Sequence, residues 1–148
     1  MSFSPNFRGA MAKGSSRQLQ TNYPSGSVST MTKGIPVSIT VFSQIVPTDV
    51  SSEASVKAIV GLLGTDLVSA ATGPVVNNGR LESVTTSFSL GDALYVGKSG
   101  NLINTKPTIG SYGFVSGDFV IFIGVVVQNE FNSLLTDIQL LVNIVGQL

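Results

Sequence analysis

The sequence predicts a mainly β protein: a small antiparallel β-barrel or sandwich with one short helix and an extended N-terminal arm. Two observations carry this prediction. Twice a Gly-Asp pair, at Gly91-Asp92 and at Gly117-Asp118, opens a run of β-branched and aromatic residues, and Gly and Asp are favoured in tight turns between strands. Several runs also alternate apolar and polar side chains with the period of two that a half-buried strand requires.

The chain divides into two segments by charge. Residues 1–33 carry four basic side chains and no carboxylate, whereas residues 34–148 carry the other four basic side chains and all eight acidic ones. The first segment is rich in Ser, Gly, Gln and Asn and has no sustained period, so it cannot bury enough apolar surface to fold alone. We therefore expect an extended basic arm at 1–33 and a β-rich body at 34–148.

Aromatic and basic residues are spaced singly along this arm. Three interpretations remain open. The arm is a solvated terminus, or it lies across the acidic body of a neighbouring copy, or it binds nucleic acid, for which four scattered charges make no continuous track along a phosphate backbone. The residues expected to bind a partner are Phe3, Phe7, Arg8, Arg17 and Tyr23.

In the first half of the body, apolar residues recur with two periods. Alternation between residues 34 and 46 predicts one half-buried strand. From Ser51 to Leu63 the spacing i, i+3, i+4, i+7 predicts an amphipathic helix of about three turns with Asp49 or Ser51 as its N-cap, and a strand with a bulge is the alternative. The residues that set these periods are Ile35, Val37, Ile39 and Val41 in the strand and Val56, Ile59, Val60 and Leu63 in the helix.

Turn residues divide the rest of the body. Asn78-Gly79 predicts a hairpin between strands at 74–77 and 80–89. The four residues from Gly97 to Gly100 predict another tight turn, between strands at 93–96 and 101–103.

The last two strands are the most apolar. Phe119 to Val127 is apolar on both faces and predicts the central core strand, with Gly124 marking a bulge or a close backbone contact. Asp137 to Val145 predicts the final strand. In it Ile138, Leu140, Val142 and Ile144 are expected to face the core, while Leu141 and Val145 make the outer face unusually apolar.

The composition indicates assembly. The chain is 43% hydrophobic and only 11% charged, with no net charge, against a usual charged share of about a quarter. We therefore expect neighbouring subunits to cover part of the surface, and a monomer coated in Ser, Thr and Asn is the alternative. No apolar run has the length of a membrane span, and the N-terminus has no continuous apolar segment of the kind that a secretory signal requires, so we expect no membrane partner.

The residue types disfavour catalysis. The chain has no Cys and no His, which removes the commonest general base and the commonest transition-metal ligands. The carboxylates are scattered, although Asp92 and Asp118 remain candidates to share a cation. Gly97-Lys98-Ser99-Gly100 lacks the upstream glycine of a phosphate loop. We expect no cofactor, no metal and no enzyme activity.

Gly91 to Leu102 (G-D-A-L-Y-V-G-K-S-G-N-L), followed by Gly117 to Gly124 (G-D-F-V-I-F-I-G), resembles small virion proteins of tailed bacteriophages, among them head decoration, or capsid cement, proteins. The resemblance covers Gly34 to Leu148. It implies localisation in the virion, assembled in the host cytoplasm, and an absence of catalytic residues. Its implied partners are the major capsid protein and sister subunits, with a homotrimer favoured and the arm clamping neighbouring capsid proteins.

The arm departs from that pattern, because it is longer and more basic than in the simplest decoration proteins. This leaves a tail, collar, baseplate or fibre component, involved in host-surface attachment, as the alternative. Such a module would bind a cell-surface glycan through loops such as Ser69 to Gly73 or Thr105 to Tyr112.

Overall fold

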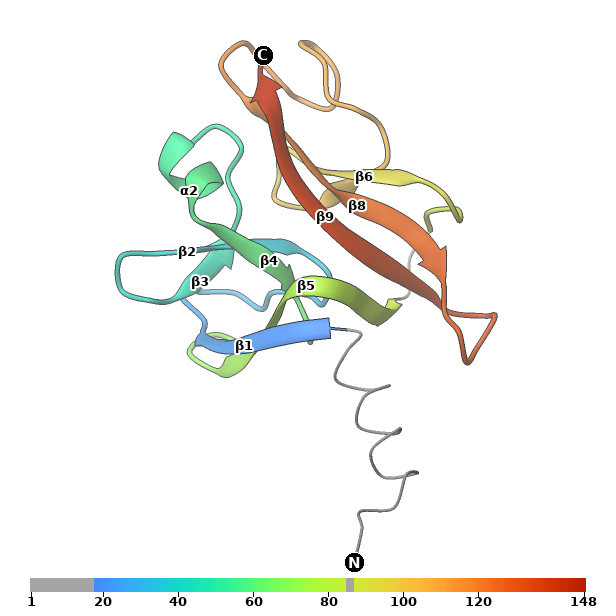
Figure 1. The fold of residues 1–148 in the computed structure, drawn as a ribbon. Helices are drawn as coiled ribbons and strands as arrows, with labels where there is room; N and C mark the ends of the chain where they lie inside the picture. Colours follow the sequence, from blue (N-terminus) through green and yellow to red (C-terminus); the bar gives the residue numbers. More distant parts are fainter. Residues whose placement is uncertain (1–17, 85–86) are drawn as a thin grey trace, which may run out of the picture.

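Nine strands and one short helix make up residues 18–84 and 87–148, the part of the chain that the computed structural model describes (Figure 1). The strands form a single antiparallel sheet in the order β3-β2-β4-β5-β9-β8-β6-β7, and β1 pairs with β5. The predicted mainly β class is therefore confirmed. The barrel alternative is wrong for these residues, because β3 and β7 end the sheet without pairing with each other.

In chain order the elements are β1 (Gln18–Pro24), β2 (Pro36–Ile39), β3 (Ile45–Pro47), α2 (Glu53–Lys57), β4 (Ile59–Leu63), β5 (Thr72–Val84), β6 (Ala93–Val96), β7 (Leu102–Ile103), β8 (Phe119–Gln128) and β9 (Thr136–Gln147).

The long strand β5 joins two halves of the sheet. Up to Gly79 it pairs with β1 and β4, and from Arg80 onward it pairs with β9. The predicted Asn78-Gly79 hairpin is therefore wrong, because one strand continues through both residues. Gly79 has a φ of 83°, which glycine adopts without a steric cost. The Asn-Gly pair bends a single strand instead of reversing it.

Apolar side chains fill the space between the two halves of the sheet. A second set of apolar side chains covers the opposite face of the half that contains β4. The larger cluster takes Leu62 and Val76 from one half and Ile121 and Ile138 from the other. A smaller cluster takes the adjacent residues Leu63 and Val75 on the opposite face. Strands β4 and β5 are thus buried on both sides, which is the arrangement of a sandwich core.

The helix is shorter than predicted. Helix α2 ends at Lys57, with Ser52 as the N-cap whose hydroxyl accepts a hydrogen bond from Ser55 N (3.2 Å), and strand β4 follows directly from Ile59. Because β4 is buried on both faces, its apolar residues follow one another without polar residues between them. Together with Val56, they happen to have the spacing i, i+3, i+4, i+7 that is typical of an amphipathic helix. The bulged-strand alternative describes this second part correctly.

The predicted strand at 34–46 is in fact a hairpin. β2 and β3 pair across a turn in which Thr40 N donates to Gln44 O (2.7 Å). Val41 and Phe42 lie at the tip of this turn and are 92% and 80% exposed. Val41, the last residue of the predicted alternation, therefore lies outside both strands.

The predictions for β6, β7 and β8 are confirmed. β6 and β7 form a hairpin through the turn from Gly97 to Gly100, and β8 lies between β6 and β9. At Gly124 the register of β8 shifts, and a Cβ there would overlap the backbone of Gln139 on β9. Gly124 is thus both the bulge and the close contact that its position in an apolar strand indicates.

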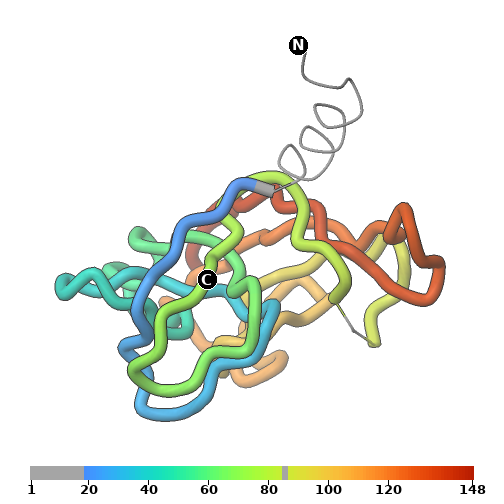
Figure 2. The backbone as a smooth tube through the Cα atoms, turned by 90° about the horizontal axis from the view of Figure 1, so that it is seen from below, coloured from blue at the N-terminus to red at the C-terminus, as the bar shows by residue number. Residues whose placement is uncertain are grey.

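Part of the segment expected to form the arm lies against the body. Residues Gln18–Pro24 are β1, which pairs with β5 along its length, and Figure 2 shows the two segments side by side. Tyr23 is half-buried and packs on the smaller apolar cluster. Phe3, Phe7, Arg8 and Arg17 lie outside the described residues, and the division of the chain at residue 33 stays a prediction.

Candidate interaction surface

The candidate functional surface is the last part of β9. β8 pairs with β9 from Thr136 to Gln147, but β5 pairs only with its beginning, as far as Gln139. From Leu140 onward, no other strand of the described chain pairs with the second edge of β9 (Figure 1). We call this stretch, Leu140 to Gln147, the free edge.

Apolar side chains of the free edge are open to solvent. Leu141, Val142, Ile144 and Val145 are 55%, 39%, 43% and 45% exposed, whereas Leu140 is buried. The prediction that Val142 and Ile144 face the core is wrong, because β5 leaves β9 before these residues. The prediction of an apolar outer face at Leu141 and Val145 is confirmed.

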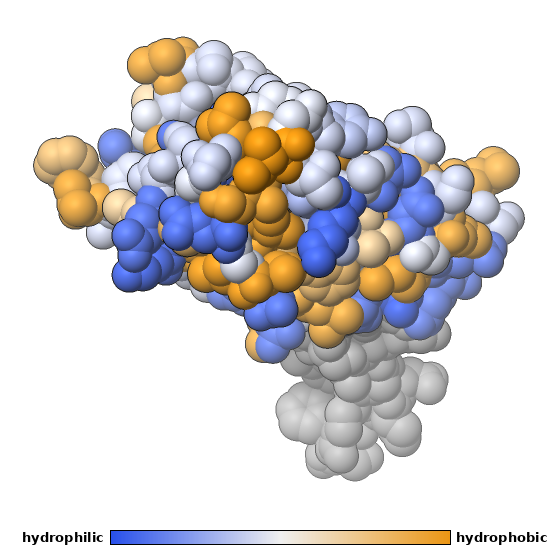
Figure 3. All heavy atoms as spheres, turned by 90° about the horizontal axis from the view of Figure 1, so that it is seen from above, coloured by the Kyte–Doolittle hydropathy of each residue, from blue (hydrophilic) through white to orange (hydrophobic). Residues whose placement is uncertain are grey.

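This edge lacks the charges and the proline that often protect an exposed strand. Natural edge strands commonly carry Lys, Pro or inward-pointing charges that prevent pairing with another chain. The residues from Gln139 to Gln147 include none of these. Figure 3 shows the molecule from the side on which β9 ends, and apolar side chains gather in a patch near the middle of this face.

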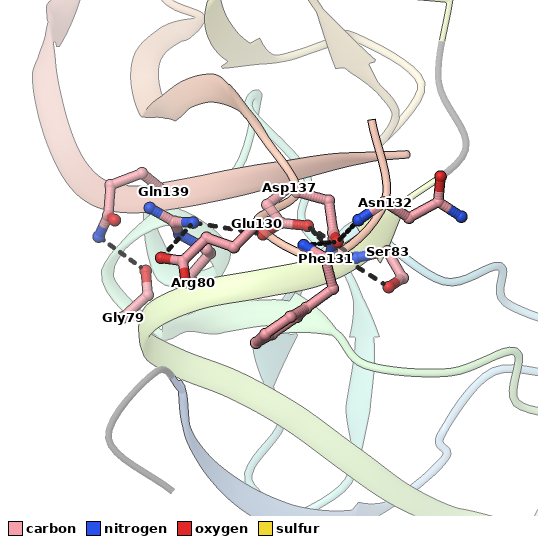
Figure 4. Close-up of polar contacts among 9 residues, drawn as sticks. Gly79, Arg80, Ser83, Glu130, Phe131, Asn132, Asp137 and Gln139 are labelled. Carbon is pink, nitrogen blue, oxygen red and sulfur yellow. Dashed lines mark hydrogen bonds and ion pairs between the residues drawn. The ribbon is translucent and has the colours of Figure 1, made fainter. Parts of the chain in front are cut away.

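A polar cluster around the buried side chains of Asp137 and Asn129 fixes the first part of β9 in place (Figure 4). The carboxylate of Asp137 accepts hydrogen bonds from Ser83 N and from Asn129 Nδ2, both at 2.9 Å. Arg80 Nη1 lies 3.5 Å from Asp137 Oδ2 and 3.7 Å from Glu130 Oε1. These contacts join β5, β9 and the turn between β8 and β9.

The same cluster shapes the turn before β9. Asn129 Oδ1 accepts hydrogen bonds from the backbone N–H groups of Phe131 and Asn132, both at 2.9 Å. Gln139 Nε2 donates to the carbonyl of Gly79 (3.0 Å), the point at which β5 bends. β9 is therefore paired on both edges up to Gln139, and the free edge begins at the next residue.

The two Gly-Asp pairs build the same four-residue turn. Asp92 N donates to Ser89 O (3.1 Å) and Asp118 N donates to Val115 O (3.2 Å). Each carboxylate also accepts a hydrogen bond from the first N–H of its turn, at 3.0 and 2.9 Å. Both glycines have positive φ, as such turns require. The role of these residues in the described structure is to start β6 and β8.

Asp92 and Asp118 do not lie together. Because β6 and β8 are antiparallel and Ala93 pairs with Val125, Asp92 lies near the end of β8 and Asp118 lies at its beginning. At about 3.3 Å per residue, the two carboxylates are separated by roughly 20–25 Å along the strand. The hypothesis that they share a cation is wrong, and the described residues contain no group of three or more metal-binding side chains.

Asp118 instead pairs with a lysine. Lys98 Nζ lies 2.6 Å from Asp118 Oδ2, with the carboxylate buried and the lysine partly exposed. Burial alone would raise the pKa of Asp118, but the hydrogen bonds from Lys98 and from Val115 N outweigh it, so that the pKa is lowered. This ion pair ties the turn from Gly97 to Gly100 to the start of β8.

The apolar outer face of the last strand predicts part of the free edge from the sequence. How far the free edge extends depends on where β5 ends, which the sequence does not show.

Comparison of the chain with protein-family models, with curated proteins and with solved structures finds no match. In the described part of the chain, no helix is long and apolar enough to cross a bilayer.

Proposed function

We propose that this protein is a non-enzymatic structural subunit of a tailed-bacteriophage virion, a decoration or cement protein that stabilises the head by binding the capsid and sister subunits. The observation that carries the proposal is the free edge of β9. It combines strand backbone that no other strand of the described residues pairs with, four exposed apolar side chains and no charge.

Such an edge favours a protein partner. Contiguous exposed apolar patches mark interaction sites, and an unpaired strand adds the directional hydrogen bonds of sheet extension. The low charge of the whole chain supports the same conclusion, because a surface that stays covered in an assembly needs fewer charged groups. The Gly91–Leu102 and Gly117–Gly124 segments resemble phage decoration proteins, and this resemblance is the reason for proposing a phage head as the assembly that the protein joins.

The N-terminal arm supplies the second attachment. Phe3, Phe7, Arg8 and Arg17 precede β1 in a segment without carboxylates, while the body carries all the acidic residues. In the proposed mechanism this arm reaches a neighbouring capsid or sister subunit and tethers it. Each tether turns further contacts into intramolecular ones, which stabilises a shell without chemistry. A trimeric arrangement of the copies stays a prediction.

Removing the arm tests this function. The deletion should stop at residue 17, since β1 begins at Gln18 and belongs to the sheet. We expect the variant that lacks residues 2–17 to keep the melting temperature of the full chain but to lose most of its occupancy on particles prepared without the protein. Full occupancy of the truncated chain on these particles would contradict the proposal.

A role in host attachment, as a tail, collar or baseplate component, is favoured by one further observation. The loop after β7 exposes Ile109 and Tyr112, and the Tyr112 hydroxyl lies 3.3 Å from Thr105 Oγ1. An exposed aromatic ring on a hydrogen-bonded loop suits a sugar-binding surface. Binding of the protein to host cells, with no binding to empty capsids, would favour this function over decoration.

A further inference from the structure

We propose that Asn78 is a site of spontaneous covalent modification in the folded protein, where the backbone nitrogen of Gly79 displaces the side-chain amide and closes a succinimide. Water then opens this ring to aspartate or isoaspartate. The inference goes beyond the proposed function and does not depend on it, because it uses only the bend of β5 and the chemistry of the Asn-Gly pair.

The sequence singles out this asparagine. Asn78 is the one asparagine of the chain that a glycine follows. Glycine has no side chain to cover its backbone nitrogen, and it adopts dihedral angles that other residues avoid. The nitrogen of Gly79 is therefore the least hindered nucleophile that follows any asparagine in this chain.

The structure places the two reacting groups together. Gly79 N lies 2.8 Å from Oδ1 of Asn78. The carbon under attack, Cγ, is bonded to this oxygen at about 1.2 Å, so it lies no more than about 4 Å from the nitrogen. The distribution of χ2 is broad in asparagine, and a rotation about this bond brings the two atoms to the roughly 3–3.5 Å of a near-attack arrangement.

The backbone at this site is held on one edge. Among the described strands, β1 alone pairs with Asn78 and Gly79, and it does so through Gln18 and Leu19, at its very beginning. β4 pairs with β5 before this point, and β9 pairs with β5 after it. The register of β1 against β5 also shifts directly after Leu19. Because strand ends open locally at little cost, the ring can close while both halves of the sheet stay folded.

The chemistry balances without an oxidant or a reductant. The bond between Gly79 N and Asn78 Cγ forms as the bond between Cγ and Nδ2 breaks, and Nδ2 leaves as ammonia with the proton of the Gly79 N–H. One water molecule then opens the succinimide. Attack at Cγ gives aspartate, whereas attack at the backbone carbonyl carbon gives isoaspartate, in which the main chain continues through Cβ and Cγ.

The modification changes the backbone next to the start of the free edge. Isoaspartate lengthens the main chain by one methylene group at the bend of β5, and both products add a negative charge. The carbonyl of Gly79 accepts the hydrogen bond from Gln139 Nε2 (3.0 Å), and Arg80 pairs with Gln139. An added carbon at residue 78 therefore displaces the residues that pair with β9 relative to those that pair with β1 and β4.

Peptide mapping of the full chain tests the proposal, with Asn77 as an internal control. Asn77 is exposed like Asn78, but the residue that follows it is not glycine. After incubation of the folded protein in mildly alkaline buffer, fragment mass spectra locate deamidated residues, and enzymatic methylation of isoaspartate detects that product. We expect Asn78 to deamidate at least about tenfold faster than Asn77, with isoaspartate as well as aspartate among the products.

The same measurement on the chain unfolded in urea separates the effect of the sequence from that of the fold. We expect the rate at Asn78 in the folded protein to lie within about tenfold of the rate in the unfolded chain, because the bend leaves the pair free to react. Equal rates at Asn78 and Asn77 would overturn the proposal. A folded protein that deamidates at Asn78 more than about tenfold slower than the unfolded chain would also overturn it, since the sheet would then protect the pair.

Discussion

At Gly124 the backbone of β9 leaves no room for a side chain on β8, so replacing this glycine with alanine tests the packing at the base of the free edge. The new methyl carbon would overlap the carbonyl oxygen of Gln139 and lie 2.9 Å from its carbonyl carbon. Non-bonded carbon atoms reach their optimal separation only at about 3.5–4.0 Å. The obstacle is backbone in a paired strand, which cannot rotate away as a side chain would.

Because the backbone cannot rotate away, the expected loss in the free energy of unfolding is large. Overpacked cores typically lose about 1–3 kcal/mol, and occasionally more. Because the strands themselves must separate at Gly124, we expect Gly124→Ala to lower the free energy of unfolding by about 3 kcal/mol. In a domain of this size each kcal/mol shifts the melting temperature by about 2–4 °C, so the expected decrease is about 6–12 °C. Thermal unfolding followed by circular dichroism measures it.

Gly146→Ala is the matched control. Gly146 lies on the same pair of strands, opposite Val120, and a methyl group there meets no atom within 4 Å. We expect its free energy of unfolding to change by no more than about 0.5 kcal/mol. If Gly124→Ala melts as close to the native protein as this control does, the close approach of β8 and β9 at Gly124 is not present in solution and the reasoning is refuted.

Two further predictions concern the buried carboxylates. Asp137→Ala leaves the Ser83 N–H and the Asn129 amide without their acceptor, and we expect a loss of about 3 kcal/mol in urea unfolding; an unchanged midpoint would mean that the cluster does not hold β9. The pKa of Asp118 is lowered in the folded state, so its contribution to stability is complete above about pH 4 and decreases as the pH falls through the lowered value. The native protein should therefore lose more stability between pH 7 and pH 3 than Asp118→Asn, whereas equal losses would contradict this account.

Local chemistry made some elements predictable. The Gly-Asp pairs start β6 and β8 because a positive φ at glycine and a backbone N–H that donates to the aspartate carboxylate stabilise the same turn. The turn from Gly97 to Gly100 is decided by its own residues in the same way. None of these features depends on what lies far away in the chain.

Other elements depended on tertiary packing. β4 resembles a helix in the sequence because it is covered on both faces, which only the arrangement of the sheet determines. Asn78-Gly79 forms a bend instead of a hairpin because β1 and β4 pair with the residues before it and β9 pairs with those after it. Val142 and Ile144 are exposed because β5 leaves β9 at Gln139, and no local pattern shows where a neighbouring strand ends.

The irregularity of β9 bears on which partner it can accept. Its register against β8 shifts on both sides of the step from Asn143 to Ile144, and such shifts bend a strand and increase its twist. An arbitrary extended peptide matches this shape poorly, which limits uncontrolled pairing at an edge without charge or proline.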